Sequence, residues 1–243
     1  GLGGIQPSQA DYWQATKATG HGDFQILVFA PSTVQEMVDL VSDAFDAADR
    51  WRMPAMILAD GMLGQMMEPV SLPEEGRAQL VDKPWAACGH GDSRPHNVIN
   101  SLYLTPDKLE ELVMTRYHRY QLVKEQEQRA EEYLCEDADL VIVAYGASAR
   151  VARSAVNKAR EQGYKVGLIR PITLWPFPVQ ALKKAAATAK SFLVVEMSMG
   201  QMVDDVKLAI DCQVPVHFYG RTGGMIPTPN QVLEDVERIM EHG

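Results

Sequence analysis

Residues 139–169, DLVIVAYGASARVARSAVNKAREQGYKVGLI, carry the pattern that decides the fold. The apolar run Leu140–Tyr145 predicts a buried strand, and Ala149–Glu161 has the composition and apolar spacing of a helix. Gly163 follows that helix where glycine is favoured as a terminator, and Val166–Ile169 predicts the next strand. A strand, a helix and a strand in this order predict a parallel βαβ unit.

The same alternation continues to the end of the chain. Further helices are predicted at Val179–Ala189, Met202–Ile210 and Gln231–Met240, and further strands at Phe192–Val195 and Val214–Phe218. Four short apolar strands separated by helices predict a small doubly wound α/β domain over residues 137–243.

A first block, residues 1–105, is also predicted to be α/β. The apolar runs Ile26–Ala30 and Ala55–Ala59 are typical of parallel strands that are buried on both faces. Between them, Ser32 or Thr33 can cap a helix. Residues 61–106 contain turn signals and no sustained helical or strand periodicity of apolar residues, which predicts loops that cover the core.

A charged segment, residues 106–136, separates the two blocks and predicts a connector helix. The helical pattern extends over Pro106–Glu132. Its apolar stripe comprises Leu109, Leu112, Val113, Tyr117, Tyr120 and Val123. The remaining charged positions predict a solvated outer face.

Charge and composition exclude several classes of function. The formal net charge of -9 disfavours a nucleic-acid partner, because no basic stripe is present to neutralise phosphates. Charged or polar residues interrupt every apolar stretch, so no membrane span is expected, and a cytoplasmic location is the default expectation. Cys88, Cys135 and Cys212 are too far apart to form a C-x-x-C pair, and the six histidines are scattered. We therefore expect no zinc, iron–sulfur or other metal site in this chain.

Polar residues follow directly on the predicted strand at residues 55–59. Asp60 and Gly61 lie at its carboxyl end, where ligand crevices form in open parallel sheets, and Gln65 and Glu68 continue the same loop. Two interpretations remain open for Asp60, capping of the turn or contact with a ligand. The glycine-rich segment Gly1–Gln9 can bring backbone N–H groups against an anion.

The junction around Gly146 raises the question of a dinucleotide site. A dinucleotide-binding fingerprint needs three glycines at fixed spacing, and Gly146 has no partner at those positions. We favour a tight strand-to-helix turn, and a nucleotide-binding α/β protein stays the weakest of the hypotheses.

Six segments, in this order, resemble landmarks of one enzyme family: Gly1–Asp11, Gly20–Asp23, Ala59–Val70, Gly167–Pro178, Glu196–Met202 and Gly220–Gly224. The segments extend over nearly the whole chain. On this resemblance the chain is identified as a member of the 2-oxoacid:ferredoxin oxidoreductases. It is most similar to the carboxyl-terminal portion of an α-type subunit of the 2-ketoisovalerate type.

The resemblance implies a fold and an activity. The first block is then the carboxyl-terminal part of a thiamine-diphosphate-binding parallel-sheet domain, and the second is a transketolase C-terminal-like domain. Members of the family convert a 2-oxoacid oxidatively to its acyl-CoA and pass electrons to ferredoxin. Thiamine diphosphate and Mg²⁺ are shared with a β-type subunit, and coenzyme A is the co-substrate. Iron–sulfur clusters lie in partner subunits, and the further partners are an iron–sulfur (ferredoxin-like) subunit and a γ subunit.

The resemblance also implies roles for individual residues. Gly4, Ile5 and Gln6 form a substrate-side loop, Asp60, Gly61, Gln65 and Glu68 lie near the cofactor, and Arg170 and Arg221 contact a partner or coenzyme A. Both arginines have the alternative of pairing with local acids. The family's activating glutamate and substrate-binding arginine would precede Gly1, so we expect no catalytic residue here and expect an amino-terminal portion to be missing. An apolar Ile5 favours a branched aliphatic substrate, since an unpaired carboxylate is costly to bury.

Two alternatives remain within the same family. In the first, the chain is a non-catalytic interaction scaffold of such a complex, and titration with thiamine diphosphate and Mg²⁺, with and without a β-type partner, separates it from the enzyme subunit. In the second, the chain is part of a pyruvate- or 2-oxoglutarate-specific enzyme, which turnover of different 2-oxoacids by the intact complex distinguishes.

Overall fold

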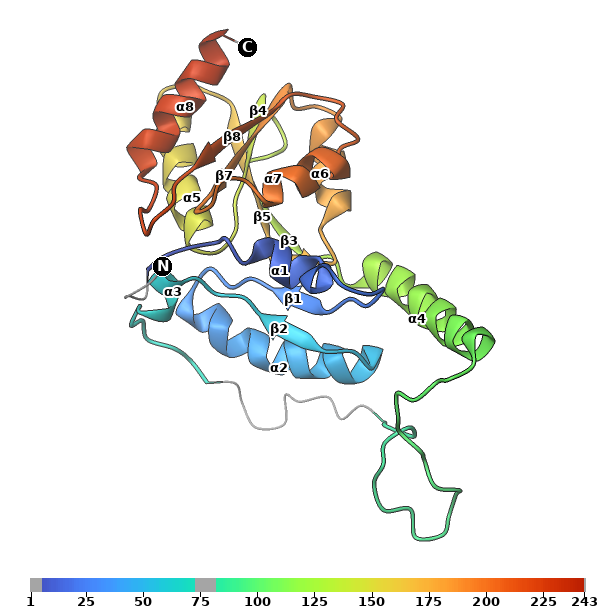
Figure 1. Ribbon diagram of the computed structural model, residues 1–243. Coiled ribbons are helices and arrows are strands. Elements are labelled where there is room, and N and C mark those ends of the chain that lie inside the picture. The colour runs from blue at the N-terminus through green and yellow to red at the C-terminus, as the bar shows by residue number, and fades with distance from the viewer. Residues whose placement is uncertain (1–5, 73–81, 243) are drawn as a thin grey trace.

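The computed structural model describes residues 6–72 and 82–242, which form two β-sheets with helices packed against them (Figure 1). The sheets have three strands, in the order β2-β1-β6, and five strands, in the order β3-β5-β4-β7-β8. The model confirms the α/β class expected from the sequence.

The smaller sheet is built mainly from the first block. β1 (Leu27–Phe29) and β2 (Ala55–Ile57) pair in parallel, and α2 (Val34–Trp51) connects them. Thr33 caps α2 by accepting a hydrogen bond from the N–H of Glu36, so the predicted strand–helix–strand order is confirmed.

The third strand of this sheet comes from the second block. β6 (Thr173–Trp175) pairs antiparallel with β1 and lies in the smaller sheet, although its sequence neighbours belong to the larger one. The chain thus crosses between the sheets directly after β5 (Val166–Pro171). The sequence pattern did not predict a strand at Thr173–Trp175, because the pairing partner is remote in the sequence.

The larger sheet has the predicted parallel core. β4 (Leu140–Val143) pairs in parallel with β5 and with β7 (Ser191–Glu196), and β7 pairs in parallel with β8 (Val216–Gly220). α5 (Gly146–Glu161) and α8 (Pro229–His242) pack together on one face. α6 (Val179–Ala186) and α7 (Met202–Ala209) cover the other face (Figure 1).

Alternation along β4 divides the apolar core into two layers. Val141 and Val143 join the core that includes α6, α7 and the smaller sheet, whereas Leu140 and Ile142 join the core under α5 and α8. All four side chains are fully buried. A strand that buries both faces has no polar position, which explains the continuous apolar run in the sequence.

The connector differs from its prediction. α4 (Pro106–Gln126) ends earlier than expected, and β3 (Ala130–Tyr133) pairs antiparallel with β5 at the edge of the larger sheet. The prediction of a single helix through residue 132 was therefore wrong. The backbone of β5 offers hydrogen bonds to β3, and helix propensity cannot reveal them. Of the predicted stripe, Tyr120 and Val123 are buried, whereas Tyr117 is 53% exposed.

The rest of the first block consists of short elements and loops. α1 (Tyr12–Thr16) and a 3₁₀ turn (Ala18–Gly20) precede β1, and α3 (Gly61–Gly64) follows β2. Apart from α3, the described part of the predicted loop region before α4 contains no helix or strand, as expected. No helix in the described ranges is long and apolar enough to cross a membrane.

The three cysteines should differ sharply in reactivity. Cys88 and Cys212 are exposed, whereas Cys135 is buried and its thiol donates a hydrogen bond to the carbonyl oxygen of Leu168. Burial raises the pKa of the Cys135 thiol, which suppresses the reactive thiolate form. We expect iodoacetamide to modify Cys88 and Cys212 in the folded protein and Cys135 only after unfolding. Peptide mass mapping checks this, and early labelling of Cys135 would contradict the packing around β5.

Candidate functional site

Asp60 stands where β2 ends and joins three elements. One carboxylate oxygen, Oδ1, accepts hydrogen bonds from the N–H groups of Met62 and Leu63, both at 3.0 Å, and so caps α3. The other oxygen, Oδ2, accepts the N–H of Ala147 at 3.1 Å, in the first turn of α5. Asp60 is 7% exposed. The capping interpretation is therefore observed, and the same carboxylate also links the carboxyl ends of the two sheets.

Gly146 makes that link possible. Its φ of +56° lies in the left-handed region that favours glycine, and a Cβ at this position would lie 3.1 Å from Oδ2 of Asp60. The N-terminus of α5 is the place where a dinucleotide fold would bind a pyrophosphate, and here the carboxylate of Asp60 takes the Ala147 N–H. This arrangement favours the tight-turn interpretation over a nucleotide site.

The opening segment reaches the same junction. Gly4 and Ile5 lie outside the described residues, whereas the side chain of Gln6 lies close to Gly224, where a Cβ would stand 2.7 Å from Oε1 of Gln6. Further along, Gln9 is buried beside Asp60. A cavity of about 30 Å³ lies between the opening segment and the end of β2, and its lining comprises Ser8, Gln9, Asp11, Leu58, Ala59, Asp60 and Tyr145. The structure thus brings Asp60 and the opening segment together.

The remaining residues after β2 lie around α3 and the start of α2. Gly61 is the first residue of α3 and Gln65 is its C-cap. Glu68 turns away toward α2, where it accepts the N–H of Val34 at 3.1 Å and forms an ion pair with Arg150 at 2.8 Å. The Arg150 hydrogen bond, followed by the Val34 N–H, lowers the pKa of Glu68. Glu68 therefore stays ionised and fixes the start of α2.

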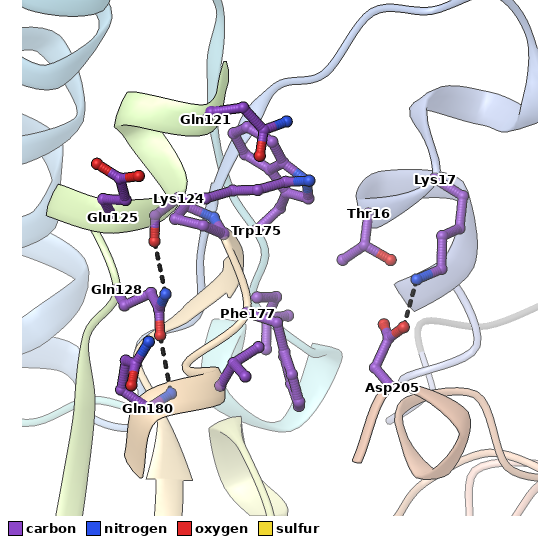
Figure 2. A pocket seen from close by; sticks show the side chains of 13 residues that line it. Thr16, Lys17, Gln121, Lys124, Glu125, Gln128, Trp175, Phe177, Gln180 and Asp205 are labelled. Carbon is purple, nitrogen blue, oxygen red and sulfur yellow. Dashed lines mark hydrogen bonds and ion pairs between the residues drawn. The ribbon is translucent and has the colours of Figure 1, made fainter. Parts of the chain in front are cut away.

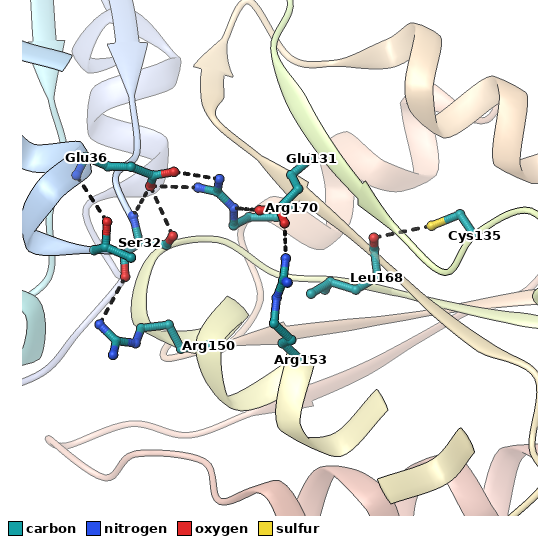
Figure 3. A network of polar contacts seen from close by, with 9 residues as sticks. Ser32, Glu36, Glu131, Cys135, Arg150, Arg153, Leu168 and Arg170 are labelled. Carbon is teal, nitrogen blue, oxygen red and sulfur yellow. Dashed lines mark hydrogen bonds and ion pairs between the residues drawn. The ribbon is translucent and has the colours of Figure 1, made fainter. Parts of the chain in front are cut away.

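Arg170 and Arg221 have contrasting environments. The guanidinium of Arg170 forms ion pairs with Glu36 on α2 and Glu131 on β3, and its side chain is 7% exposed (Figure 3). Arg221 follows β8, and its backbone N–H donates to the carbonyl oxygen of Glu196 at 3.1 Å. The local pairing considered from the sequence is thus present for Arg170, and contact of either arginine with a partner or coenzyme A stays a prediction.

Sequence reasoning missed two buried polar residues at this junction, Gln9 and Glu196. Glu196 is fully buried at the end of β7, and its carboxylate accepts hydrogen bonds from the N–H groups of Met202 and Val203 at 3.0 Å. It also accepts the N–H of Gln201 and the hydroxyl of Ser198. The carboxylate therefore caps α7 from outside the helix. Polar residues inside the apolar run of residues 191–197 were the available signal for Glu196.

Two buried tyrosines, Tyr12 and Tyr145, contact Gln9. Burial raises the pKa of both Tyr12 and Tyr145 well above 10.0, and nearby carboxylates act in the same direction. Both phenols are therefore protonated, and the Tyr12 hydroxyl donates to Asp205 at 2.5 Å. Both tyrosines act as hydrogen-bond donors, and Tyr145 lines the cavity beside Asp60.

A larger cavity, of about 430 Å³, lies between α1, α4, α6 and α7 (Figure 2). Trp175 and Phe177 supply apolar surface, and Lys17 forms an ion pair with Asp205 at its rim. None of the candidate site residues predicted from the sequence lines this cavity. Across the residues with described positions, no group of three or more His, Cys, Asp or Glu side chains could hold a metal ion.

Two family models together match almost the entire chain. Residues 3–138 match the model described as pyruvate flavodoxin/ferredoxin oxidoreductase, thiamine diphosphate-binding. Residues 138–232 match the model described as pyruvate:ferredoxin oxidoreductase core domain II.

Curated relatives of this chain are subunits of the same kind of enzyme. The ketoisovalerate oxidoreductase subunit VorB of Methanothermobacter marburgensis is 46% identical over 98% of this chain and 67% of its own length. The 2-oxoglutarate synthase subunit KorA of the same organism is 29% identical over 94% of this chain and 68% of its own length.

Among solved structures, the 2-oxoglutarate:ferredoxin oxidoreductase of Magnetococcus marinus has the same fold, with a TM-score of 0.73 and 20% identity. The match includes 96% of this chain and 45% of that one. The chain spans about two thirds of the length of its curated relatives. Given the two family models and the 46% identity over most of its length, the chain belongs to the 2-oxoacid:ferredoxin oxidoreductases, as an α-type subunit.

Proposed function

We propose that this chain works in an assembled 2-oxoacid:ferredoxin oxidoreductase that converts a branched-chain 2-oxoacid, such as 2-ketoisovalerate, to its acyl-CoA and reduces ferredoxin. The observation that carries the proposal is the 46% identity to a ketoisovalerate oxidoreductase subunit over 98% of the chain. Relatives named for 2-oxoglutarate are less similar, at 29–31% identity, which favours the branched-chain substrate.

The chain fits one side of a thiamine diphosphate site. The cavity beside Asp60 has a volume of about 30 Å³, whereas pockets for cofactors have volumes of roughly 300–1,000 Å³. The described residues also lack a carboxylate cluster for the metal ion that accompanies a diphosphate. In this proposal a β-type subunit therefore supplies the diphosphate and Mg²⁺ contacts and the opposite wall.

In this proposal the residues of this chain form and support one wall of the cofactor and substrate pocket. When bound, thiamine diphosphate supplies the electron sink for loss of CO₂ from a 2-oxoacid. Asp60 and Gly61 hold the strand-end wall in place through α3 and α5. The opening segment with Gly4, Ile5 and Gln6 faces the substrate, and Gln65 and Glu68 belong to the supporting wall.

Contacts with coenzyme A and with partner subunits belong to the same proposal. Arg221 is the stronger candidate, because its loop carries two glycines of positive φ, Gly223 and Gly224, and lies against Gln6. Arg170 is the weaker candidate, because its guanidinium is buried and already ion-paired. Iron–sulfur clusters would lie in a ferredoxin-like partner subunit, since the described cysteines of this chain form no cluster site, and a γ subunit would complete the complex.

Substrate competition on the assembled complex tests the proposal. The natural gene product, co-expressed with its partner subunits, should reduce ferredoxin in a coenzyme A-dependent reaction. We expect kcat/KM for 2-ketoisovalerate to exceed that for 2-oxoglutarate by about tenfold or more, because removing an uncompensated buried carboxylate gains at least ~1.4 kcal/mol. A higher kcat/KM for 2-oxoglutarate or pyruvate would refute the branched-chain assignment.

The scaffold alternative has its own observable. If the chain were a non-catalytic scaffold, adding it to the β-type partner would leave the affinity of that partner for thiamine diphosphate unchanged. Our proposal expects saturable binding of thiamine diphosphate with Mg²⁺ that tightens when both subunits are present. Calorimetric titration with and without the partner distinguishes the two.

A further inference from the structure

The buried side chain of Gln9 makes three hydrogen bonds at the junction of the two sheets. It is 4% exposed and lies beside Asp60 at the carboxyl ends of the strands. Its oxygen Oε1 accepts hydrogen bonds from Ser148 Oγ at 2.8 Å and from the N–H of Met197 at 2.9 Å. Its nitrogen Nε2 donates to the carbonyl oxygen of Tyr145 at 2.9 Å.

The backbone of Gln9 is held by the same neighbours. Its N–H donates to the carbonyl oxygen of Met197 at 2.8 Å, and its carbonyl oxygen accepts the hydroxyl of Tyr145 at 3.3 Å. All of these partners lie in the second block, at the ends of β4 and β7. The opening segment is therefore attached to the larger sheet at one residue through both its side chain and its backbone.

An amide is the side chain that these partners require. The carbonyl oxygen of Tyr145 needs a donor, whereas Ser148 and the Met197 N–H need an acceptor. Glutamine provides both on one planar group, while an ionised glutamate provides acceptors alone. A buried partner left unsatisfied costs more than the hydrogen bond contributes.

The attachment point adjoins the strand-end wall directly. A Cβ at Gly146 would lie 3.2 Å from Nε2 of Gln9 and 3.1 Å from Oδ2 of Asp60, so both side chains pack against the same glycine. Three residues before Gln9, the side chain of Gln6 lies against Gly224. Gln9 thus anchors the chain three residues after Gln6, the described residue of the predicted substrate-side loop.

We propose that Gln9 is a positioning residue for the 2-oxoacid. By holding the opening segment against Tyr145, Ser148 and Met197, it sets where the segment faces the substrate, without touching the reacting atoms. The inference rests on the proposed function, because it assigns the segment to the substrate side of that site.

The test compares Gln9→Glu with Gln14→Glu in the assembled complex. Gln14 lies five residues later on α1 and is exposed, so its variant controls for the same chemical change outside the junction. For Gln9→Glu we expect KM for the 2-oxoacid to rise about tenfold, since the donor to Tyr145 is lost, with kcat within about threefold of wild type. Affinity for thiamine diphosphate should stay within about twofold, because the change is confined to the substrate side.

Amide hydrogen exchange supplies a readout independent of activity. The N–H groups of Gln9 and Met197 should exchange faster in Gln9→Glu than in Gln14→Glu, because both take part in the attachment. Unchanged KM in Gln9→Glu, or a fall in kcat alone that matches the loss of assembled enzyme, overturns the inference. Unchanged exchange at both amides overturns it as well.

A second variant serves if Gln9→Glu does not assemble. Ser148→Ala removes one of the two hydrogen bonds to Oε1, and we expect KM to rise in the same direction by about threefold, with an unchanged KM overturning the inference. A wild-type complex that turns over no 2-oxoacid refutes the proposed function instead. In that case the exchange comparison still decides whether Gln9 holds the opening segment.

Discussion

Replacing Glu196 by leucine should lower the free energy of unfolding by about 4 kcal/mol, because several buried donors lose their acceptor together. The fully buried carboxylate accepts the N–H groups of Gln201, Met202 and Val203 at the start of α7. Leucine has a similar volume and no acceptor, so these N–H groups would remain buried without partners. Chemical denaturation followed by circular dichroism measures the change.

Two further variants control this prediction. Glu234→Leu makes the same replacement at an exposed position of α8 and should change stability by less than about 0.5 kcal/mol. Glu196→Gln keeps one acceptor oxygen and should fall between wild type and Glu196→Leu. Equal stabilities of Glu196→Leu and Glu234→Leu would show that α7 does not depend on this cap.

Replacing Arg170 by methionine should cost about 3 kcal/mol, because the guanidinium joins three elements in a buried position. Nη1 and Nη2 bind Glu36 on α2 at 3.0 and 2.8 Å, and Nε binds Glu131 on β3 at 2.7 Å (Figure 3). Arg153 also pairs with Glu131, and so adds α5 to the same network. The carboxylates are about one third exposed, which places the cost at the lower end for breaking a buried ion pair. Thermal and chemical unfolding of the variant measure the loss.

Arg221→Met is the matched control for that substitution. Its side chain lies on the loop after β8, outside the network of Arg170, so its loss should change stability by less than about 0.5 kcal/mol. In the assembled complex the same variant should raise KM for coenzyme A or weaken subunit association. A large loss of stability in Arg221→Met together with none in Arg170→Met would reverse the roles assigned to the two arginines.

Local sequence patterns were sufficient to predict the four parallel strands of the larger sheet. Residues 140–143 and 192–195 are continuous apolar runs. The apolar spacing of α5 and the glycine that follows it, Gly163, are also local signals. Such signals are strong because burial on both faces of a parallel sheet excludes polar residues along each run.

The two antiparallel strands could not be predicted in this way. β3 contains two glutamates and β6 precedes a proline, so neither has the composition of a central strand. Each forms because a neighbouring strand offers unpaired backbone groups, β5 to β3 and β1 to β6. The paired residues are 35 or more positions apart in the chain, from Tyr133 and Leu168 upward, and that information is absent from a local window.

Only part of the candidate site could be predicted, because the rest also depends on contacts between remote parts of the chain. Asp60 and Gly61 could be predicted because they directly follow a predicted strand, and ligand crevices form at the carboxyl ends of parallel strands. Gln9 was not, since its side-chain partners Tyr145 and Met197 lie 136 and 188 residues away in the chain. The role of a buried amide is set by the groups that fold around it, and these groups carry no motif of their own.

The central claim is that the end of β2 and the opening segment form one wall of a thiamine diphosphate pocket, whose other wall belongs to another polypeptide. An electron cryomicroscopy structure of the assembled complex with thiamine diphosphate bound tests it most directly. We expect the thiazolium ring to lie in the space faced by Asp60 and Gln6, with a β-type subunit on its far side. A ring enclosed by partner subunits alone, remote from both residues, would contradict the claim.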